Sequence, residues 1–503
     1  MNAASLSFDN LERYGEYRKL YFEGNSWTNA DRLRYAGSLA AVLRDCGVEP
    51  GDRVAVMMPN SPEVESAFQA IWMLGAAILP ITPQLVAREV GYMLQDSGAR
   101  VVLTSPALAT RLSEAWAATP SIRHLLVFGA SDAKRVIDIA AQVASAPVMD
   151  SMVDRAADDL ALLLYTSGTT GHPKGVMLTH GNVLSGVEAA LLKSPGMPRE
   201  TLLQPLPLSH VYGVMVMNVS NVWGWTTILM PHFETARALK LIERYKPTRM
   251  SAIPTMLVYL INSPDREKYD TSSLAHVTSG GASLIESVRT EFERLYHCAV
   301  HQGYGLSETA AVATGYGYGE AYRPGSVGRA LPGMELQIRD LLGRALPAGE
   351  WGEIAIRGPV IMKGYWNNPQ ATQAALAGGW LLTGDIGYLD ADGFVYITDR
   401  RKDLIIKGGE NIASKEVEDA LHSHPSVAEV AVVGIPDDTH GENICAVVVL
   451  KPGSKASAEE LLEHASRSIT KFKLPARIVF VDALPKSPVG KILKREIRRQ
   501  LSR

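Results

Sequence analysis

A dense group of hydroxyl-bearing residues and glycines stands at residues 165–175, and these residue types could bind an anion. The stretch reads Tyr-Thr-Ser-Gly-Thr-Thr-Gly-His-Pro-Lys-Gly and follows an apolar run, 159–164, short enough to be a buried strand. Glycines let backbone N–H groups approach phosphate oxygens, hydroxyls donate further hydrogen bonds, and Lys174 supplies positive charge. No Gly-Lys-Ser/Thr triplet follows, so this is not a Walker A loop. Composition alone leaves a plain surface loop open as the alternative.

A second motif, Gln-Gly-Tyr-Gly-Leu-Ser-Glu-Thr at residues 302–309, combines an aromatic ring with a carboxylate. Tyr304 lies between two glycines and could expose a flat face on which a base stacks, worth about 1–3 kcal/mol in nucleic-acid systems. Glu308 would repel phosphates unless a Mg²⁺ ion lies between them. Because Glu308 replaces a third glycine, the motif is not a dinucleotide fingerprint. A structural turn is the alternative.

Four further segments carry candidate chemistry. Asp385 follows a Thr-Gly turn and could accept both hydroxyls of a ribose, at roughly 1.5–3 kcal/mol per charge-assisted bond. His210 and Tyr212 follow a loop held extended by two prolines, where a packed structural histidine is the alternative. Residues 279–283, Ser-Gly-Gly-Ala-Ser, form a small-residue turn that allows close backbone approach before a helix. Lys491 follows a Pro- and Gly-rich turn, which predicts its presentation on a loop.

The 165–175 stretch resembles the signature loop of the adenylate-forming superfamily, which includes acyl-CoA synthetases, peptide-synthetase adenylation domains and firefly luciferase. The other motifs occur in the order typical of that family, and the resemblance extends over residues 27–495. It implies ATP and Mg²⁺ for activation of an acid, and coenzyme A as co-substrate. The family often has proline where Ser414 stands.

The resemblance also implies roles for individual residues. Catalytic roles fall to Lys491, Glu308, Thr166 and His210, with Glu308 as the metal ligand. The implied ATP and AMP contacts are Thr166, Ser167, Gly168, Thr169, Thr170, Lys174, Gly281, Ala282, Gln302, Gly303, Tyr304, Ser307, Asp385 and Arg400. The implied acyl pocket consists of His210, Val211, Tyr212, Gly280, Gly281 and Gly305. Lys402 matches a hinge pivot, and Gly408 and Gly409 match a segment lining the tunnel for the pantetheine arm of CoA.

The hydrophobic patterns predict an α/β protein with a large N-terminal domain, 1–401. Alternating helical and strand patterns between 27 and 105 form a βαβαβ unit, hence a parallel sheet covered on both faces. A second parallel sheet is expected from strands at 160–165, 226–230, 249–253, 276–279 and 299–302. Residues 106–158 are weakly patterned and are predicted as helix and loop.

Two smaller units complete the expected architecture. From about residue 315 to 400, short strands separated by Gly and Pro predict a small antiparallel, barrel-like subdomain. Residues 402–503 should form a small mobile α+β domain with its own core, carrying Lys491. Its expected elements are helices at 414–422 and 457–469 and a hairpin-like pair at 427–435 and 443–451, followed by a basic, solvated terminal helix.

Length, charge and cysteine content exclude several classes of protein. A chain of 503 residues is too long for one core. With 50 basic and 53 acidic residues, the net charge of −3 argues against nucleic-acid binding. Three scattered cysteines form neither a disulfide framework nor a zinc motif, which favours a reducing cytoplasm. No signal peptide and no apolar run of about 18 residues is evident. Peripheral membrane contact and a homodimer both remain open.

These observations together predict an ATP-dependent acyl-CoA synthetase that forms an acyl-adenylate and then an acyl-CoA. The expected pocket walls at 210–213, 279–283 and 304–311 contain no Lys or Arg, which favours a hydrophobic monocarboxylic acid. A fatty acid is the first choice, and an aryl or arylalkenyl acid of the benzoate or coumarate type is the second. Three alternatives differ in chemistry: a ligase that loads a carrier protein, a luciferase-like oxygenase, and a non-catalytic nucleotide sensor. Retention of Lys491 and Glu308 disfavours the sensor.

Overall fold

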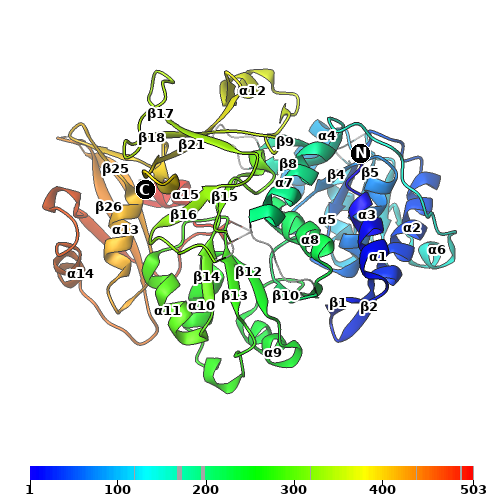
Figure 1. Cartoon of the computed structure of the whole chain (residues 1–503), viewed down its shortest axis with the longest axis horizontal. Coiled ribbons are helices and arrows are strands. Elements are labelled where there is room, and N and C mark those ends of the chain that lie inside the picture. The colour runs from blue at the N-terminus through cyan, green and yellow to red at the C-terminus, as the bar shows by residue number, and fades with distance from the viewer. Residues whose placement is uncertain are drawn as a thin grey trace.

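The computed structural model describes residues 1–117, 119, 121–166, 173–193, 199–317, 319–437, 439–487 and 490–501. Figure 1 shows three sheets in the larger part of the molecule and a fourth in the smaller C-terminal part, drawn in orange and red at the left. The chain is therefore a mixed α/β protein with a large N-terminal and a small C-terminal domain, as predicted. Four predicted nucleotide contacts, Ser167, Gly168, Thr169 and Thr170, lie outside the described residues.

The first sheet contains eight strands in the order β19-β9-β8-β4-β3-β5-β6-β7. The predicted βαβαβ unit supplies its centre: β3 (Arg53–Met57), α3 (Pro62–Met73), β4 (Ala77–Pro80), α4 (Ala87–Ser97) and β5 (Val101–Thr104). These strands are parallel and buried on both faces, against α2 (Asn29–Asp45) and α3 on one side and α4 and α5 (Pro106–Ala117) on the other. Because parallel strands end at one edge, β8 (Leu160–Thr166) delivers Thr166 to that edge.

Residues 106–158 were predicted as helix and loop only, and that prediction is wrong. The segment also contains β6 (His124–Val127) and β7 (Val136–Asp138), which extend the first sheet in parallel. Both strands are too short to show a clear hydrophobic period. β6 pairs with β5, and β7 pairs with β6, so these strands form through pairing with a neighbour rather than through a local sequence pattern.

The second sheet has seven strands in the order β14-β13-β12-β10-β11-β1-β2. Five of them come from the middle of the chain: β10 (Thr201–Gln204), β11 (Thr226–Leu229), β12 (Arg249–Ala252), β13 (His276–Ser279) and β14 (Ala299–Gln302). All five are parallel, and four of them were predicted for this sheet. The prediction was wrong for the strand at 160–165, which is β8 of the first sheet, and it missed β10, whose four residues show no clear period. One face is covered by α9 (Thr235–Tyr245), α10 (Pro254–Ile261) and α11 (Glu286–Tyr296). A hairpin near the N-terminus, β1 (Arg18–Phe22) and β2 (Asn25–Thr28), adds an unpredicted edge.

The third sheet is antiparallel, as predicted for residues 315–400. Its order is β15 (Thr314–Gly315), β16 (Ser326–Ala330), β22 (Phe394–Arg400), β21 (Trp380–Leu389), β18 (Gly352–Arg357) and β17 (Glu335–Arg339), with β20 (Leu376–Ala377) paired to β21. Among the described residues the hydrogen bonding does not close β15 onto β17, so the sheet is open rather than a closed barrel. The β21–β22 register places Asp385 opposite Arg400.

Within its described residues, the C-terminal domain has a five-stranded sheet and three α-helices. Its long hairpin is β25 (Val427–Asp437) and β26 (Gly441–Leu450), joined by β23 (Ile405–Lys407), β24 (Glu410–Ile412) and β27 (Arg477–Phe480). The helices are α13 (Ser414–His422), α14 (Ala458–Ala465) and α15 (Lys494–Leu501). The predicted boundary at 401/402 lies between β22 and β23, and stays a prediction.

The terminal helix α15 was predicted to be solvated, and this is wrong for one of its faces. Ile497 is buried in the domain core. Lys494 pairs with Glu418 at 2.7 Å, and Arg498 pairs with Asp403 at 3.0 Å. These ion pairs hold the end of the chain on α13 and on the segment after β22.

Contacts between the two domains involve Lys486 and Gly490, which lie close to Lys491 in the sequence. Thr255 on α10 donates to the carbonyl of Gly490 at 3.2 Å, and Lys486 donates to the Tyr259 hydroxyl at 2.9 Å. Asp399 accepts hydrogen bonds from both the backbone N–H and the hydroxyl of Ser414. The C-terminal domain is thereby docked over the second sheet. No helix in the described ranges is long and apolar enough to cross a membrane.

Candidate active site

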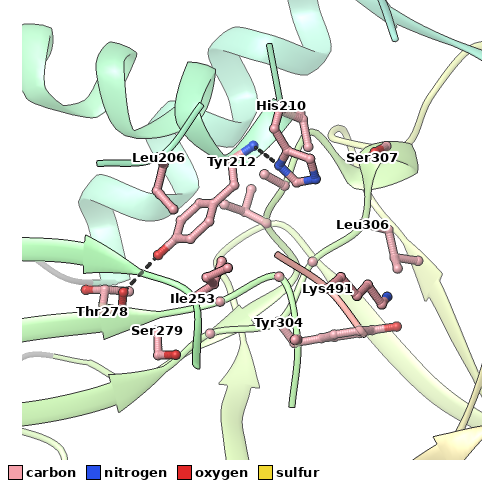
Figure 2. Close-up of a pocket in the computed structure, with 18 of the residues that line it drawn as sticks. Leu206, His210, Tyr212, Ile253, Thr278, Ser279, Tyr304, Leu306, Ser307 and Lys491 are labelled. Carbon is pink, nitrogen blue, oxygen red and sulfur yellow. Dashed lines mark hydrogen bonds between the residues drawn. The ribbon is translucent and has the colours of Figure 1, made fainter. Parts of the chain in front are cut away.

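One large cavity, of about 1040 Å³, lies where the carboxyl ends of the two parallel sheets meet the C-terminal domain. Figure 2 shows part of its wall, with residues from α8 (Val211–Trp223), from the ends of β13 and β14, and from the Lys491 loop around one space. The predicted site residues that line it are Thr166, Lys174, His210, Val211, Tyr212, Gly280, Gly281, Ala282, Gln302, Gly303, Tyr304, Gly305, Ser307, Glu308, Arg400, Lys402 and Lys491. The fold thus brings together residues from across most of the chain.

Three predicted residues do not line this cavity. Asp385 is buried directly behind it. Gly408 and Gly409 form the exposed turn between β23 and β24, both with positive φ, at 60° and 89°. In this arrangement of the domains, Lys491 is inside the cavity and the glycine turn is outside it.

The strands on either side of the predicted phosphate loop are paired, although residues 167–172 themselves lie outside the described residues. Thr166 at the end of β8 lies opposite Lys174 at the start of β9 (Lys174–Thr179), so the two side chains flank the loop. The Lys174 ammonium lies 5.0 Å from the ring centroid of Tyr365, whose hydroxyl donates to Glu308 Oε1 at 2.8 Å. A cation and a carboxylate therefore face the same part of the cavity, with Tyr365 between them.

Tyr304, Asp385 and Arg400 form a bonded group at one side of the cavity. The Tyr304 hydroxyl donates to Asp385 Oδ2 at 2.6 Å, and Arg400 Nε lies 3.0 Å from Asp385 Oδ1. Burial, together with the neighbouring Asp385 carboxylate, holds the pKa of Tyr304 well above its ordinary value. The phenol is therefore neutral and its ring is held in one orientation along the cavity wall. Each oxygen of the Asp385 carboxylate thus has one of these two residues as its partner.

Lys491 lines the cavity, where its side chain stays open to solvent, and it has no anionic partner among the described residues. Burial in the cavity, and then the positive charges of Arg400 and Lys402, lower the pKa of its ammonium from 10.5 to about 8. It is therefore mostly charged at neutral pH. Its backbone N–H donates to Ser487 Oγ at 3.1 Å, which fixes the loop that carries it. An anion entering the cavity would relieve the cost of burying this charge.

His210 caps helix α8 and faces the cavity. Its Nδ1 accepts the backbone N–H of Tyr212 at 3.2 Å, so in the neutral ring the proton must be on Nε2. Burial, and then the nearby charge of Lys491, lower the pKa of His210 to about 4. The residue is therefore a neutral hydrogen-bond donor at physiological pH, and its structural role as a helix cap fixes that tautomer.

Two glycines in the cavity wall are required by close packing. A Cβ at Gly280 would lie 3.1 Å from the Tyr212 ring, so a larger residue would crowd that ring. A Cβ at Gly305 would lie 2.1 Å from the carbonyl oxygen of Ala311. The Tyr212 hydroxyl donates to the carbonyl of Thr278 at 3.1 Å, so its ring lies along β13 toward the interior of the second sheet (Figure 2).

Comparison with known proteins identifies the family. The family described as AMP-binding enzyme matches residues 8–366, and the AMP-binding enzyme C-terminal domain matches 416–491. A long-chain-fatty-acid–CoA ligase of Bacillus subtilis is 36% identical, over 98% of this chain and 93% of that protein. The chain belongs to the AMP-binding enzyme family. The relatives that establish this include acid–CoA ligases, which agrees with the class of enzyme predicted from the sequence.

Solved structures resemble this AMP-binding enzyme over its whole length. The anthranilate CoA ligase AuaEII in complex with anthranoyl-AMP has a TM-score of 0.95 at 26% identity, covering 100% of this chain and 97% of the other. MatB from Rhodopseudomonas palustris, 32% identical over 99% of both chains, gives 0.90 in its ATP-bound structure and 0.80 in its apo structure. Since sequence and coverage are equal in the two MatB comparisons, the difference arises from conformation. This enzyme has the arrangement closer to the nucleotide-bound one.

The sequence analysis missed several cavity residues. Tyr365 stands in β19 (Gly364–Tyr365), and only the pairing of β19 with β9 brings it to Glu308. Its one local signal is an aromatic pair, Tyr365-Trp366, directly after a glycine. Thr383 also lines the cavity, two residues before Asp385. Asp385 Oδ2 accepts the Tyr304 hydroxyl, a contact that the resemblance did not imply.

The predicted absence of lysine and arginine holds for the three pocket segments considered, but not for the whole cavity. Its wall also includes Lys193 and Arg249. Each is paired with a glutamate: Lys193 lies 3.4 Å from Glu320, and Arg249 contacts Glu200. The deeper part of the cavity is therefore polar, with its cations neutralised by the protein itself.

Proposed function

We propose that this AMP-binding enzyme is an ATP-dependent acid–CoA ligase. A carboxylate oxygen of the acid attacks the α-phosphorus of ATP, and the bond to pyrophosphate breaks. The thiol of CoA then attacks the acyl carbon and releases AMP. The observation that carries the proposal is the position of Lys491, which comes from the C-terminal domain yet lines the same cavity as Thr166, Lys174 and Glu308. Only an anionic, phosphate-rich substrate uses such a set of groups well.

In the adenylation step, the residues mainly compensate charge. The acid is a weak nucleophile and its target is anionic, so in-line placement and charge neutralisation matter more than a general base. We assign Lys491 to the α-phosphate and to the oxygen that bridges to the acid. The Nε2–H of His210 can donate to the acid carboxylate and hold it for attack. Because His210 is neutral, it adds a donor there without a second positive charge.

The nucleotide contacts follow from the geometry of the cavity wall. The Tyr304 ring is held by its bond to Asp385 and offers a face to adenine. Gln302, whose amide donates to the carbonyl of Ala282 at 3.3 Å, ties the two backbone segments beside that ring. We assign Thr166 and Lys174 to the phosphates and Asp385 to the ribose hydroxyls. Ribose contact at Asp385 would add to, or exchange with, its bonds to Tyr304 and Arg400.

The residues present fit a magnesium ion that arrives with ATP. The described residues contain no group of three metal-ligating side chains, so the protein does not form a complete metal cage. Mg²⁺ commonly takes one or two carboxylates and completes its shell with phosphate oxygens and water. Glu308 provides one such carboxylate, with Oε1 already oriented by Tyr365. The ion would supply positive charge to the phosphates at this position.

We propose that thioester formation uses a second arrangement of the domains. Gly408 and Gly409 are exposed in a hairpin turn away from the cavity. Rotation about Lys402 would exchange the Lys491 loop for this turn and bring the glycines beside the pantetheine arm of CoA. The rotation must break the bonds of Asp399 to Ser414 and of Thr255 to Gly490.

The acid that we propose is a hydrophobic monocarboxylic acid. A fatty acid is favoured by the similarity to a long-chain-fatty-acid–CoA ligase. An aryl acid is the second candidate, and the TM-score of 0.95 to an anthranilate CoA ligase supports it. A carrier protein in place of CoA is the remaining alternative for the acceptor. We place the enzyme in the cytoplasm on the basis of its scattered, unpaired cysteines.

The test is pyrophosphate release with a panel of acids, each assayed with and without CoA. An acid–CoA ligase forms AMP, pyrophosphate and thioester in equal amounts, and it catalyses ATP–pyrophosphate exchange without CoA. ATP–pyrophosphate exchange without thioester formation under any condition would favour a ligase that loads a carrier protein. Tight ATP binding without exchange for any acid would support a nucleotide sensor instead.

A further inference from the structure

The deep wall of the cavity is made by one face of three parallel strands of the second sheet. Successive side chains of a strand point to opposite faces. Met250, Val277 and Val300 point into the hydrophobic core beneath α9–α11. The residues on the other face, Arg249, His276 and His301, line the cavity. An enzyme for purely alkyl acids would be expected to have apolar residues on that face.

The two histidines of this wall have hydrogen-bonding capacity that the protein does not use. Within the described part of the chain, neither imidazole makes a hydrogen bond, and His301 only contacts the Tyr316 ring at 5.6 Å. Burial lowers the pKa of both rings, with the positive charge of Arg249 adding to the effect at His276. Each ring is thus neutral at physiological pH, with one donor and one acceptor nitrogen.

Arg249 does not make this wall cationic. Its guanidinium is ion-paired with Glu200, and both side chains are only 14% exposed. It also lies over the Trp225 ring, 5.1 Å from the centroid. A second carboxylate on a substrate would have to compete with Glu200 for this guanidinium. The wall is therefore polar but electrically neutral.

The wall lies beyond the point at which the acyl group would enter. The Tyr212 ring covers Gly280, and its hydroxyl reaches Thr278. Along β13, His276 precedes Gly280 by four residues, which is about 13 Å at the rise of a strand. An acid whose carboxylate lies at Lys491 and His210 would therefore reach the histidines only with its far end.

We propose that His276 and His301 select an acid whose distal end carries an uncharged hydrogen-bonding group, such as a hydroxyl. This rests on the proposed acid–CoA ligase activity and specifies its substrate. An alkyl end at this depth would strip water from two imidazoles and give them no partner, whereas a hydroxyl both donates and accepts. A site with such polar groups disfavours the analogue that lacks the hydroxyl, and roughly 10-fold per unpaired group is expected.

The test compares linear saturated acids of increasing length with their ω-hydroxy counterparts, using kcat/KM for ATP–pyrophosphate exchange. The plain acid should be preferred at short lengths, where the hydroxyl would lie against the Tyr212 ring. At the length that reaches His276, the hydroxy acid should become better by about 10-fold. His276→Phe and His301→Phe should each reduce this advantage, and His276→Gln should restore it.

Two controls keep the result interpretable. A circular dichroism spectrum of His276→Phe that matches the spectrum of the parent enzyme shows that the variant is folded. His232→Phe changes an exposed histidine that does not line the cavity and should leave both series unaffected.

The outcomes separate this inference from the proposed function. Exchange with plain acids, but no gain from a hydroxyl at any length, overturns the inference and leaves the ligase standing. A gain that persists undiminished in both phenylalanine variants, or a dicarboxylate better than every hydroxy acid, also overturns it. Absence of exchange with every acid overturns both.

Discussion

Raising the pH above neutrality should switch off adenylation through a single group, Lys491. In the empty cavity, burial and the charges of Arg400 and Lys402 lower the pKa of its ammonium from 10.5 to about 8. The charged form is the active one, so activity is present below the shifted pKa and lost as the pH rises through it.

The assay is ATP–pyrophosphate exchange measured between about pH 6 and 10. Because kcat/KM for ATP reports groups of the free enzyme, it should fall above a pH of about 8, and about one tenth should remain at pH 9. In the complex, the phosphates stabilise the ammonium, so kcat should fall only at a higher pH. Lys402→Gln removes one nearby positive charge and should raise the pKa of Lys491, so the fall in kcat/KM should occur at a higher pH.

The matched control is Lys491→Ala. Its residual ATP–pyrophosphate exchange should not show the fall in kcat/KM at alkaline pH. A kcat/KM profile that stays flat through pH 9.5 would refute the assignment. The same alkaline fall in kcat/KM in Lys491→Ala would also refute the assignment, since another group would then be titrating.

Three further predictions concern the nucleotide, the metal and the acid. Asp385→Asn should raise the KM for ATP by about 10-fold or more, because a charge-assisted bond to ribose is lost; an unchanged KM would remove Asp385 from the site. Tyr365→Phe should raise the Mg²⁺ concentration for half-maximal exchange by about 10-fold, since Glu308 loses the hydroxyl that orients it; an unchanged magnesium titration would contradict this role. Malonate and succinate should be much poorer substrates than monocarboxylates of similar length, because the cavity cations Lys193 and Arg249 are already paired; a dicarboxylate with the highest kcat/KM would refute this.

Most elements that position the site could be predicted from hydrophobic period and turn residues. Strands β5, β13 and β14 and helix α13 have the predicted bounds. Buried parallel strands appear as short apolar runs, and each is followed by the polar or glycine-rich residues that form the cavity edge. The short strands β6 and β7 were missed because three or four residues show no period, and only pairing with a neighbour makes them strands.

What the sequence could not predict is which polar residues meet across distant segments. Tyr365 and Glu308 are 57 positions apart, and Arg249, His276 and His301 come from three different strands. The type of each residue alone does not indicate a place in the cavity wall, because that place depends on the sheet face that the residue occupies. Lys494 looked like part of a solvated basic tail, yet its pairing with Glu418 fixes the helix on the C-terminal domain. A motif whose residues are contiguous in the chain can be recognised from the sequence. A pocket wall cannot, because its residues come from distant segments that only the fold brings together.

The central claim is that one active site serves two reactions in two domain arrangements, and separate assays of the half-reactions test it most directly. Lys491→Ala should lose most ATP–pyrophosphate exchange, by about 10²–10³-fold, yet still convert synthetic acyl-adenylate and CoA to thioester. Lys402→Pro should do the reverse, because a fixed φ hinders rotation at the hinge while the present arrangement, with Lys491 in the cavity, is retained. Equal loss of both half-reactions in both variants, with circular dichroism unchanged, would contradict the account.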